Sequence, residues 1–146
     1  MPPSLFQKTY FFAKEKHFNK AWKRWLGKRI NVVILKNNAS AIDALKSMSF
    51  VLRNGGHVMI FPEGTRTRDG KVGSFKNSFS LLSKELGVPV TPVALSGAFE
   101  AFPIHAKMPK FRAPIEVAFL DQVRPDSYTQ KELSNAVKRR IEHHLL

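Results

Sequence analysis

The chain has 146 residues, no cysteine and a formal charge of +13 at pH 7, from 24 Lys and Arg against 11 Asp and Glu. This length suits one compact domain over residues 1–146, and 43% hydrophobic residues exclude a disordered tail. The lack of cysteine excludes disulfides, thiolate metal sites and a cysteine nucleophile, whereas the charge predicts attraction to polyanions such as nucleic acid, an anionic membrane or a phosphorylated substrate.

The first third of the chain predicts two strands around a basic helix. Residues 10–13, Tyr-Phe-Phe-Ala, and residues 31–35, Asn-Val-Val-Ile-Leu, are apolar runs typical of strands, the second of a buried one. Between them, from about residue 15 to 26, apolar residues recur at helical spacing and most lysines lie off that face. The face includes Trp22 and Trp25, which suit an anionic bilayer surface, although we favour a core-facing helix with a solvated basic side.

A helix and a further strand come next. The pattern predicts a helix from about residue 39 to 53, capped by Asn38 and ended by Asn54-Gly55-Gly56. Residues 58–61 are typical of another buried strand. The core-facing stripe of the helix comprises Ile42, Leu45, Met48 and Leu52.

Two more helices are expected in the second half of the chain. Ser74 is the expected cap of the first, which ends at Gly87. Thr129 and Glu132 form the pattern of a capping box, which predicts the start of a C-terminal helix. The apolar faces of these two helices comprise Phe75, Phe79, Leu82 and Leu86 in the first, and Leu133, Val137, Ile141 and Leu145 in the second.

The remaining segments of the second half predict a loop and two strands. Residues 62–73 are rich in Gly, Thr and Arg, as a loop would be. Residues 88–95 predict a strand with an irregular or edge-like start, because two prolines interrupt it, and residues 115–120 predict another. Strands alternate with helices, so we expect an α/β fold with a largely parallel sheet flanked by helices.

The segment Phe-Pro-Glu-Gly-Thr-Arg, residues 61–66, carries the functional signal. It follows a predicted strand, and ligands of open α/β sheets bind beyond the carboxyl ends of strands. Gly64 allows a ligand to approach the backbone, and Arg66 offers a planar fork of donors suited to phosphate oxygens. Glu63 is suited to accept a hydrogen bond from a substrate hydroxyl or to orient Arg66. A surface turn with an ordinary Glu–Arg pair is an equally open alternative on these grounds.

This segment resembles the third motif of the 1-acylglycerol-3-phosphate (lysophosphatidate) acyltransferase family, which it matches in full. The similarity continues through Asp-Gly-Lys at residues 69–71 and Phe-Lys at residues 75–76. Residues 87–94 resemble the family's fourth motif, and Ala-Lys at residues 13–14 resembles a phosphate-binding position. The resemblance runs from about residue 12 to 102. It implies a glycerolipid acyltransferase-like α/β fold that is missing its N-terminal part.

The resemblance also implies roles for individual residues. Arg66 and Lys14 would bind the phosphate of the acceptor lipid, and Glu63 would contact its glycerol part. Pro89 and Pro92 would shape the groove for the acyl chain. The remaining candidates for the phosphate site are Gly64 and Thr65 in the same motif, with Lys36 and Lys76 as additional phosphate contacts. No metal or cofactor is implied beyond a thioester co-substrate, acyl-CoA or acyl-carrier protein.

The pattern that would supply catalysis is absent from this sequence. Acyl transfer to a hydroxyl needs a base, and the family uses a His followed by an Asp with four residues between them. Five positions after its histidines, the chain has Trp22, Pro62 and Lys110, or has already ended. In the family this pair precedes the region of Lys14, so we expect a chain truncated before Met1 and inactive or nearly so alone. A degenerate domain that binds without catalysing is the alternative.

We therefore expect part of an O-acyltransferase of phospholipid biosynthesis, acting on a lysophospholipid or glycerol phosphate. No apolar run approaches the roughly 20 residues that cross a bilayer. This favours a cytoplasmic protein at the periphery of an anionic membrane, with a fused or adjacent acyl-CoA synthetase-like ligase as a candidate partner and no specific nucleic acid. Ile-Leu-Lys at residues 34–36 stands where the family has Asp-Arg, which leaves the acceptor head group open. The rival hypothesis is a non-catalytic, charge-driven binder of anionic lipid or nucleic acid.

Overall fold

The computed structural model describes residues 7–15, 25, 29–36, 38–106, 108–110 and 112–146. These residues belong to two compact units, Met1–Ile60 and Phe61–Leu146, each of which is described by itself. The expectation of a single domain stays a prediction. Most of the basic helix expected at residues 15–26 lies outside the described residues. Of that helix, Trp25 is 60% exposed, with the Arg29 guanidinium 5.1 Å from the centre of its ring.

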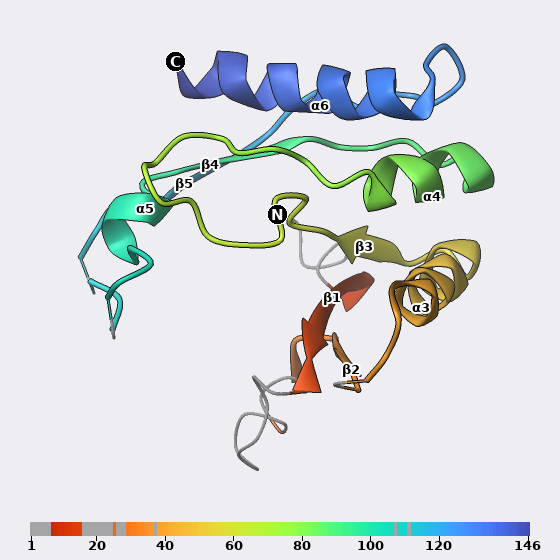
Figure 1. Cartoon of the computed structure of the whole chain (residues 1–146), viewed down its shortest axis with the longest axis horizontal. Coiled ribbons are helices and arrows are strands. Elements are labelled where there is room, and N and C mark those ends of the chain that lie inside the picture. The colour runs from red at the N-terminus through yellow and green to blue at the C-terminus, as the bar shows by residue number, and fades with distance from the viewer. Residues whose placement is uncertain (1–6, 16–24, 26–28, 37, 107, 111) are drawn as a thin grey trace. The chain divides into compact units, whose positions relative to one another are not determined.

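The first unit contains a three-stranded parallel sheet in the order β2-β1-β3 (Figure 1). Its strands are β1 (Thr9–Lys14), β2 (Val32–Leu35) and β3 (His57–Met59). All three strands were predicted from their apolar runs, although β2 is half-buried rather than fully buried. The third strand ends at Met59, so Phe61 lies outside it and its side chain is 67% exposed.

Helix α3 (Ala41–Arg53) connects β2 to β3 and starts two residues later than expected. Its cap is Ser40, whose hydroxyl accepts a hydrogen bond from the Asp43 N–H at 3.1 Å. The Asp43 carboxylate accepts one in return from the Ser40 N–H at 2.9 Å. The prediction of Asn38 as the cap is wrong. Ser40 and Asp43 form a capping box, in which each side chain accepts a hydrogen bond from the other residue's backbone N–H, so the helix starts after Ser40. The prediction of Ile42 as a core-facing residue is also wrong, since Ile42 lies in the first turn and its side chain is 63% exposed.

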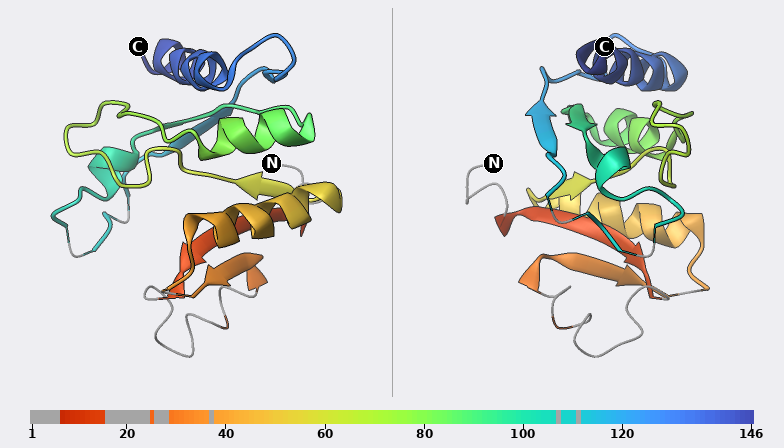
Figure 2. Two further views of the ribbon diagram at one scale, coloured as in Figure 1. Left: turned by 45° about the vertical axis from the view of Figure 1, so that its right-hand side comes forward. Right: turned by 90° about the vertical axis from the view of Figure 1, so that its left-hand side faces the viewer.

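The described residues of the second unit form two antiparallel strands and three helices (Figure 2). Strand β4 (Val93–Ser96) pairs with β5 (Glu116–Phe119), and an isolated bridge joins Val90 to Val123. The irregular start predicted for β4 is confirmed, because regular pairing begins only after Pro92. The helices are α4 (Ser78–Leu86), α5 (Ala98–Ala101) and α6 (Gln130–Leu145). The α/β class is thus confirmed, with its parallel sheet in the first unit.

The core of the second unit lies where α6 packs against α4 and β4. Leu133 is fully buried and Val137 is 3% exposed, as their helical spacing predicted. The capping box of α6 is confirmed, since Glu132 and Thr129 bond each other's backbone N–H groups at 2.8 and 3.3 Å. Other buried apolar side chains of the second unit include Phe79, Leu82, Ala94, Ala101, Val123 and Ala136.

The start of α4 differs from the prediction. The helix begins at Ser78 with Asn77 as its cap, so Ser74 is not the cap and Phe75 precedes the helix. The reason is that the Lys76 N–H donates to the Pro62 carbonyl at 2.9 Å, so residues 74–76 form part of the preceding loop and not of the helix. Phe75 still packs edge-on against Phe79, with ring centres 6.2 Å apart. Within the described residues, no helix is long and apolar enough to cross a bilayer.

Candidate functional site

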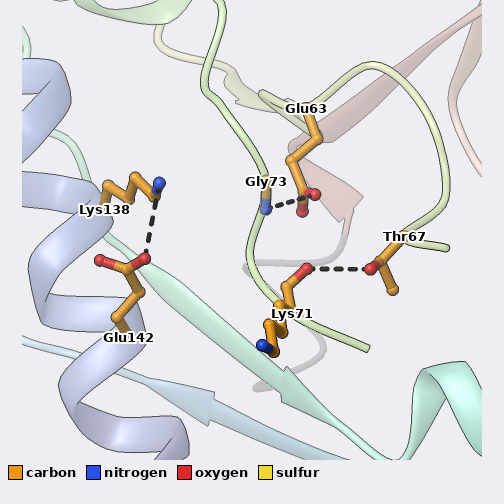
Figure 3. A network of polar contacts seen from close by, with 6 residues as sticks. All are labelled: Glu63, Thr67, Lys71, Gly73, Lys138 and Glu142. Atoms are coloured by element: carbon orange, nitrogen blue, oxygen red, sulfur yellow. Dashed lines mark hydrogen bonds and ion pairs between the residues drawn. The ribbon is translucent and has the colours of Figure 1, made fainter. Parts of the chain in front are cut away.

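Residues 61–76, called the 61–76 loop below, form a closed structure with the predicted motif at its start. The Gly64 N–H donates to the Phe61 carbonyl at 3.0 Å, which makes a tight turn, and the bond from Lys76 to Pro62 joins the two ends of the loop. The half-buried Glu63 reaches across it, and its Oε2 accepts a hydrogen bond from the Gly73 N–H at 2.9 Å (Figure 3). The carboxylate therefore bonds the loop's own backbone and not Arg66.

A second turn lies inside the loop. The Thr67 hydroxyl lies 2.9 Å from the Lys71 carbonyl (Figure 3). It also lies 3.1 Å from Asp69 Oδ1, so its single proton serves one acceptor at a time. The same Asp69 oxygen accepts a hydrogen bond from the Lys71 N–H at 3.1 Å. The hydrogen bond from the Lys71 N–H, and to a smaller extent that from the Thr67 hydroxyl, lower the pKa of the Asp69 carboxyl from its ordinary value of 3.8.

Low pH should therefore open this inner turn. The folded-state pKa of Asp69 is lowered, so its stabilising effect is present above pH 3.8 and lost as pH falls through the folded value. We expect the Lys71 amide resonance to titrate in NMR spectra with a midpoint below 3.8, and Asp69→Asn to remove that titration. A midpoint at or above the ordinary value would contradict the hydrogen-bonded carboxylate.

Gly64 and Lys76 lie against each other. Gly64 has φ +70°, a left-handed conformation that favours glycine. A Cβ at this position would lie 2.7 Å from Lys76 Nζ and 3.1 Å from its Cε, so the lysine side chain runs directly over Gly64. Both residues are exposed. The structure thus brings together two of the predicted site residues, and the ammonium group of Lys76 stands beside exposed backbone that a ligand can approach.

Arg66 is held by a segment that follows α5. Its Nη1 donates to the carbonyls of Phe102 and Pro103 at 3.3 and 3.1 Å, and its Nη2 donates to the Ile104 carbonyl at 3.4 Å. The guanidinium carbon lies 4.4 Å from the centre of the Phe102 ring, within the range of a cation–π interaction. Among the described residues, no acceptor meets the Nε–H or the second Nη2 N–H. Arg66 is exposed, so these two donors are open to a ligand.

The other predicted site residues are distributed more widely. Thr65 and Pro89 are exposed, whereas Pro92 is fully buried and its carbonyl accepts a hydrogen bond from the Leu120 N–H at 3.0 Å. Pro92 therefore shapes the strand and presents no surface of its own. Lys14 in β1 and the exposed Lys36 belong to the first unit, so the structure does not place them relative to the 61–76 loop.

Two further features bear on ligands. Within the first unit, a cleft of about 620 Å³ lies between β1 and α3, and residues including Lys8, Tyr10, Lys46 and Phe50 line it. None of the predicted site residues lines this cleft. No three histidine or acidic side chains gather into a metal site in the described part of the chain.

The sequence reasoning missed the contribution of α5 and the residues after it. This helix has only four residues, too few for a helical period to show in the sequence. The one available signal was the pair Gly97 and Pro103, which mark a short segment with a turn at each end. The role of the carbonyls in holding Arg66 had no sequence signal, because every residue has a carbonyl group.

Comparisons with known proteins find relatives of this chain among acyltransferases. The acyltransferase family model matches residues 3–96. The chloroplastic 1-acyl-sn-glycerol-3-phosphate acyltransferase BAT2 of Brassica napus is 35% identical over 102 residues, covering 68% of this chain and 30% of that protein. The chloroplastic LPAT1 of Arabidopsis thaliana, of the same description, is 38% identical over 81 residues, covering 54% and 23% respectively.

A solved structure is similar along nearly the whole chain. The 1-acyl-sn-glycerophosphate acyltransferase PlsC from Thermotoga maritima matches with a TM-score of 0.74 and 30% identity, over 94% of this chain and 57% of that chain. The chain spans less than a third of each of the two plant relatives and somewhat more than half of PlsC. Because the family model covers well over half of its residues, this chain belongs to the acyltransferase family.

Proposed function

We propose that this chain is the acceptor-binding part of a glycerolipid acyltransferase. The enzyme would transfer an acyl chain from a thioester, acyl-CoA or acyl-carrier protein, to a hydroxyl of a lysophospholipid or of glycerol phosphate. The relatives named above are described as 1-acyl-sn-glycerol-3-phosphate acyltransferases, which supports this acceptor class. The carrying observation is the 61–76 loop, which is closed by its own hydrogen bonds while two donors of Arg66 stay open.

The loop is suited to a phosphate monoester. The open donors of Arg66 match two phosphate oxygens, and a hydrogen bond between a guanidinium and a phosphate is stronger than a neutral one. Lys76, whose side chain runs over Gly64, adds a positive charge beside the exposed backbone of this glycine. Glu63 uses one carboxylate oxygen for Gly73 and keeps the other for a glycerol hydroxyl. Lys14, Lys36 and Thr65 remain candidates for further contacts.

The proposal assigns binding rather than proton transfer to this chain. A base must remove the proton of the acceptor hydroxyl as it attacks the thioester. No histidine of this sequence is followed by an Asp with four residues between them. We therefore expect acyl transfer by the 146-residue chain alone to stay near the background rate. The proposal requires no metal or other cofactor, and it places the protein on the cytoplasmic side of an anionic membrane, which the +13 charge would attract.

The test compares two arginines of the same loop. Arg68 is exposed and makes no hydrogen bond or ion pair with any described residue, so Arg68→Ala is a charge-matched control for Arg66→Ala. Binding of a lysophosphatidate short enough to stay monomeric would be measured by calorimetry. We expect Arg66→Ala to weaken it about 10- to 100-fold, the range for losing charge-assisted hydrogen bonds. Arg68→Ala should weaken it less than about threefold, since an exposed charge contributes little.

The same titrations distinguish the proposed function from the rival hypothesis of a charge-driven polyanion binder. A monoacylglycerol, which has no phosphate, should not bind measurably if the loop recognises phosphate. If the two alanine variants lose affinity equally, and if single-stranded nucleic acid binds with the same steep salt dependence, the chain is a general polyanion binder. That result would refute the proposed function.

A further inference from the structure

Residues 98–104, called the 98–104 segment below, contact the 61–76 loop at two separate places. One contact is the Phe99 ring, whose atoms lie 3.4 to 3.8 Å from where a Cβ would stand on Gly70. The other is the set of carbonyls and the Phe102 ring around the Arg66 guanidinium. The segment thus lies close to the inner turn of the loop and bonds its cation.

We infer that the 98–104 segment positions Arg66 for phosphate recognition, with Phe102 as a positioning residue. This inference rests on the proposed function, because it concerns the same loop and the same ligand. A guanidinium has five N–H donors in one plane. Three consecutive carbonyls accept hydrogen bonds from Nη1 and Nη2, so the plane of the group is defined before a ligand arrives.

The donors that remain have a definite geometry. The three engaged carbonyls are consecutive in the chain and include both acceptors of Nη1. We infer that the Ile104 carbonyl accepts from the Nη2 N–H on the Nη1 side, because it follows directly after the two carbonyls that accept from Nη1. The Nε–H and the other Nη2 N–H form a parallel pair that matches two oxygens of one phosphate. An arginine already held in this way loses less side-chain entropy on binding, which increases affinity and selectivity for phosphate.

The Phe102 ring completes this support from one side. The guanidinium carbon lies 4.4 Å from the ring centre, so the ring limits movement of the cation out of its plane. Leucine would retain much of the apolar volume and lose the π face. We expect Phe102→Leu to weaken lysophosphatidate binding about two- to fivefold, the range for an exposed cation–π contact. Phe102→Tyr retains the ring and should restore most of the affinity.

A double-mutant cycle separates positioning from a general effect on folding. In the Arg66→Ala background, Phe102→Leu should cause no further loss of lysophosphatidate affinity, because the group that it positions is gone. The matched control is Phe119→Leu, which alters a phenylalanine in β5 that is 45% exposed. This control should leave affinity unchanged in both backgrounds. Calorimetry on the whole chain provides every value of the cycle.

Two results would overturn the inference, and they are distinguishable. If Phe102→Leu weakens binding equally with and without Arg66, or if Phe102→Tyr fails to restore it, Phe102 does not act through Arg66. The proposed function survives that outcome. If Arg66→Ala itself leaves lysophosphatidate affinity unchanged, the loop is not the phosphate site, and the proposed function and this inference fail together.

Discussion

Replacing Gly97 with alanine should destabilise the second unit more than any other single change considered in this chain. Gly97 has φ +73° and caps α5, directly after β4. A Cβ on Gly97 would fall far inside van der Waals contact with the carbonyl oxygen of Pro114, and 3.2 Å from its carbonyl carbon. Both are backbone atoms close to the start of β5, so they cannot move aside as the tip of a side chain can. We expect a loss of about 3 kcal/mol or more in the free energy of unfolding.

The same substitution should also impair the candidate site. Gly97 sets the direction of the chain into the 98–104 segment, which holds Arg66. Amide hydrogen exchange in β4, β5 and α6 would measure the loss of stability, and calorimetry with lysophosphatidate would measure the loss of binding. We expect much faster exchange in all three elements and affinity reduced at least as strongly as by Arg66→Ala.

Gly87→Ala is the matched control for this prediction. Gly87 is also left-handed, with φ +64°, but nothing lies within 4 Å of where its Cβ would stand. Alanine there meets only the strain of the left-handed conformation, about 1–2 kcal/mol. The comparison therefore isolates the clash with Pro114. Equal losses for the two variants would mean that backbone strain alone, and not the contact, makes Gly97 necessary.

Leu133→Ala should cause the second-largest loss of stability. Leu133 is fully buried in α6, the helix that packs on both α4 and β4. Truncation removes apolar contacts and leaves a cavity, which costs about 2–5 kcal/mol for a buried leucine. Chemical denaturation followed by circular dichroism would measure the loss in the free energy of unfolding. The control is Leu145→Ala in the same helix, where the side chain is 37% exposed and the expected loss is below about 1 kcal/mol.

These two leucine variants also test how the second unit is built. If Leu133→Ala and Leu145→Ala have the same small effect, α6 does not form the core that its burial indicates. If Leu133→Ala unfolds the chain completely, its far-UV spectrum will lose the helical signal, and the free energy of unfolding of wild type is then smaller than the cost of the cavity. The first outcome contradicts the packing of α6, and the second agrees with it.

Local patterns were enough to locate most of the regular structure. The β-branched run before Lys36 and the apolar run from Tyr10 predicted β2 and β1, because strands depend on side chains that fit a pleated, covered sheet. The capping box at Thr129 and the left-handed Gly87 predicted helix ends, because a cap involves only neighbouring residues. The prediction of a cap failed where two nearby polar residues were both suitable, as with Asn38 and Ser40.

The sequence by itself determined the family and the residue types of the candidate site. The motif at residues 61–66 contains a carboxylate, a glycine and a guanidinium whose chemistry points to phosphate in any conformation that exposes them. The missing His–Asp spacing was likewise a property of the sequence alone. Both rest on which side chains are present and in what order, and need no knowledge of their surroundings.

Only the tertiary structure decided what each of these side chains does within the unit. Glu63 bonds Gly73 rather than Arg66, and Lys76 lies over Gly64. Arg66 bonds carbonyls 36 to 38 residues further along the chain. Such partners are backbone groups common to all residues, so no residue type identifies them in the sequence. They come together through contacts between residues far apart in the chain, and a local pattern contains no information about such contacts.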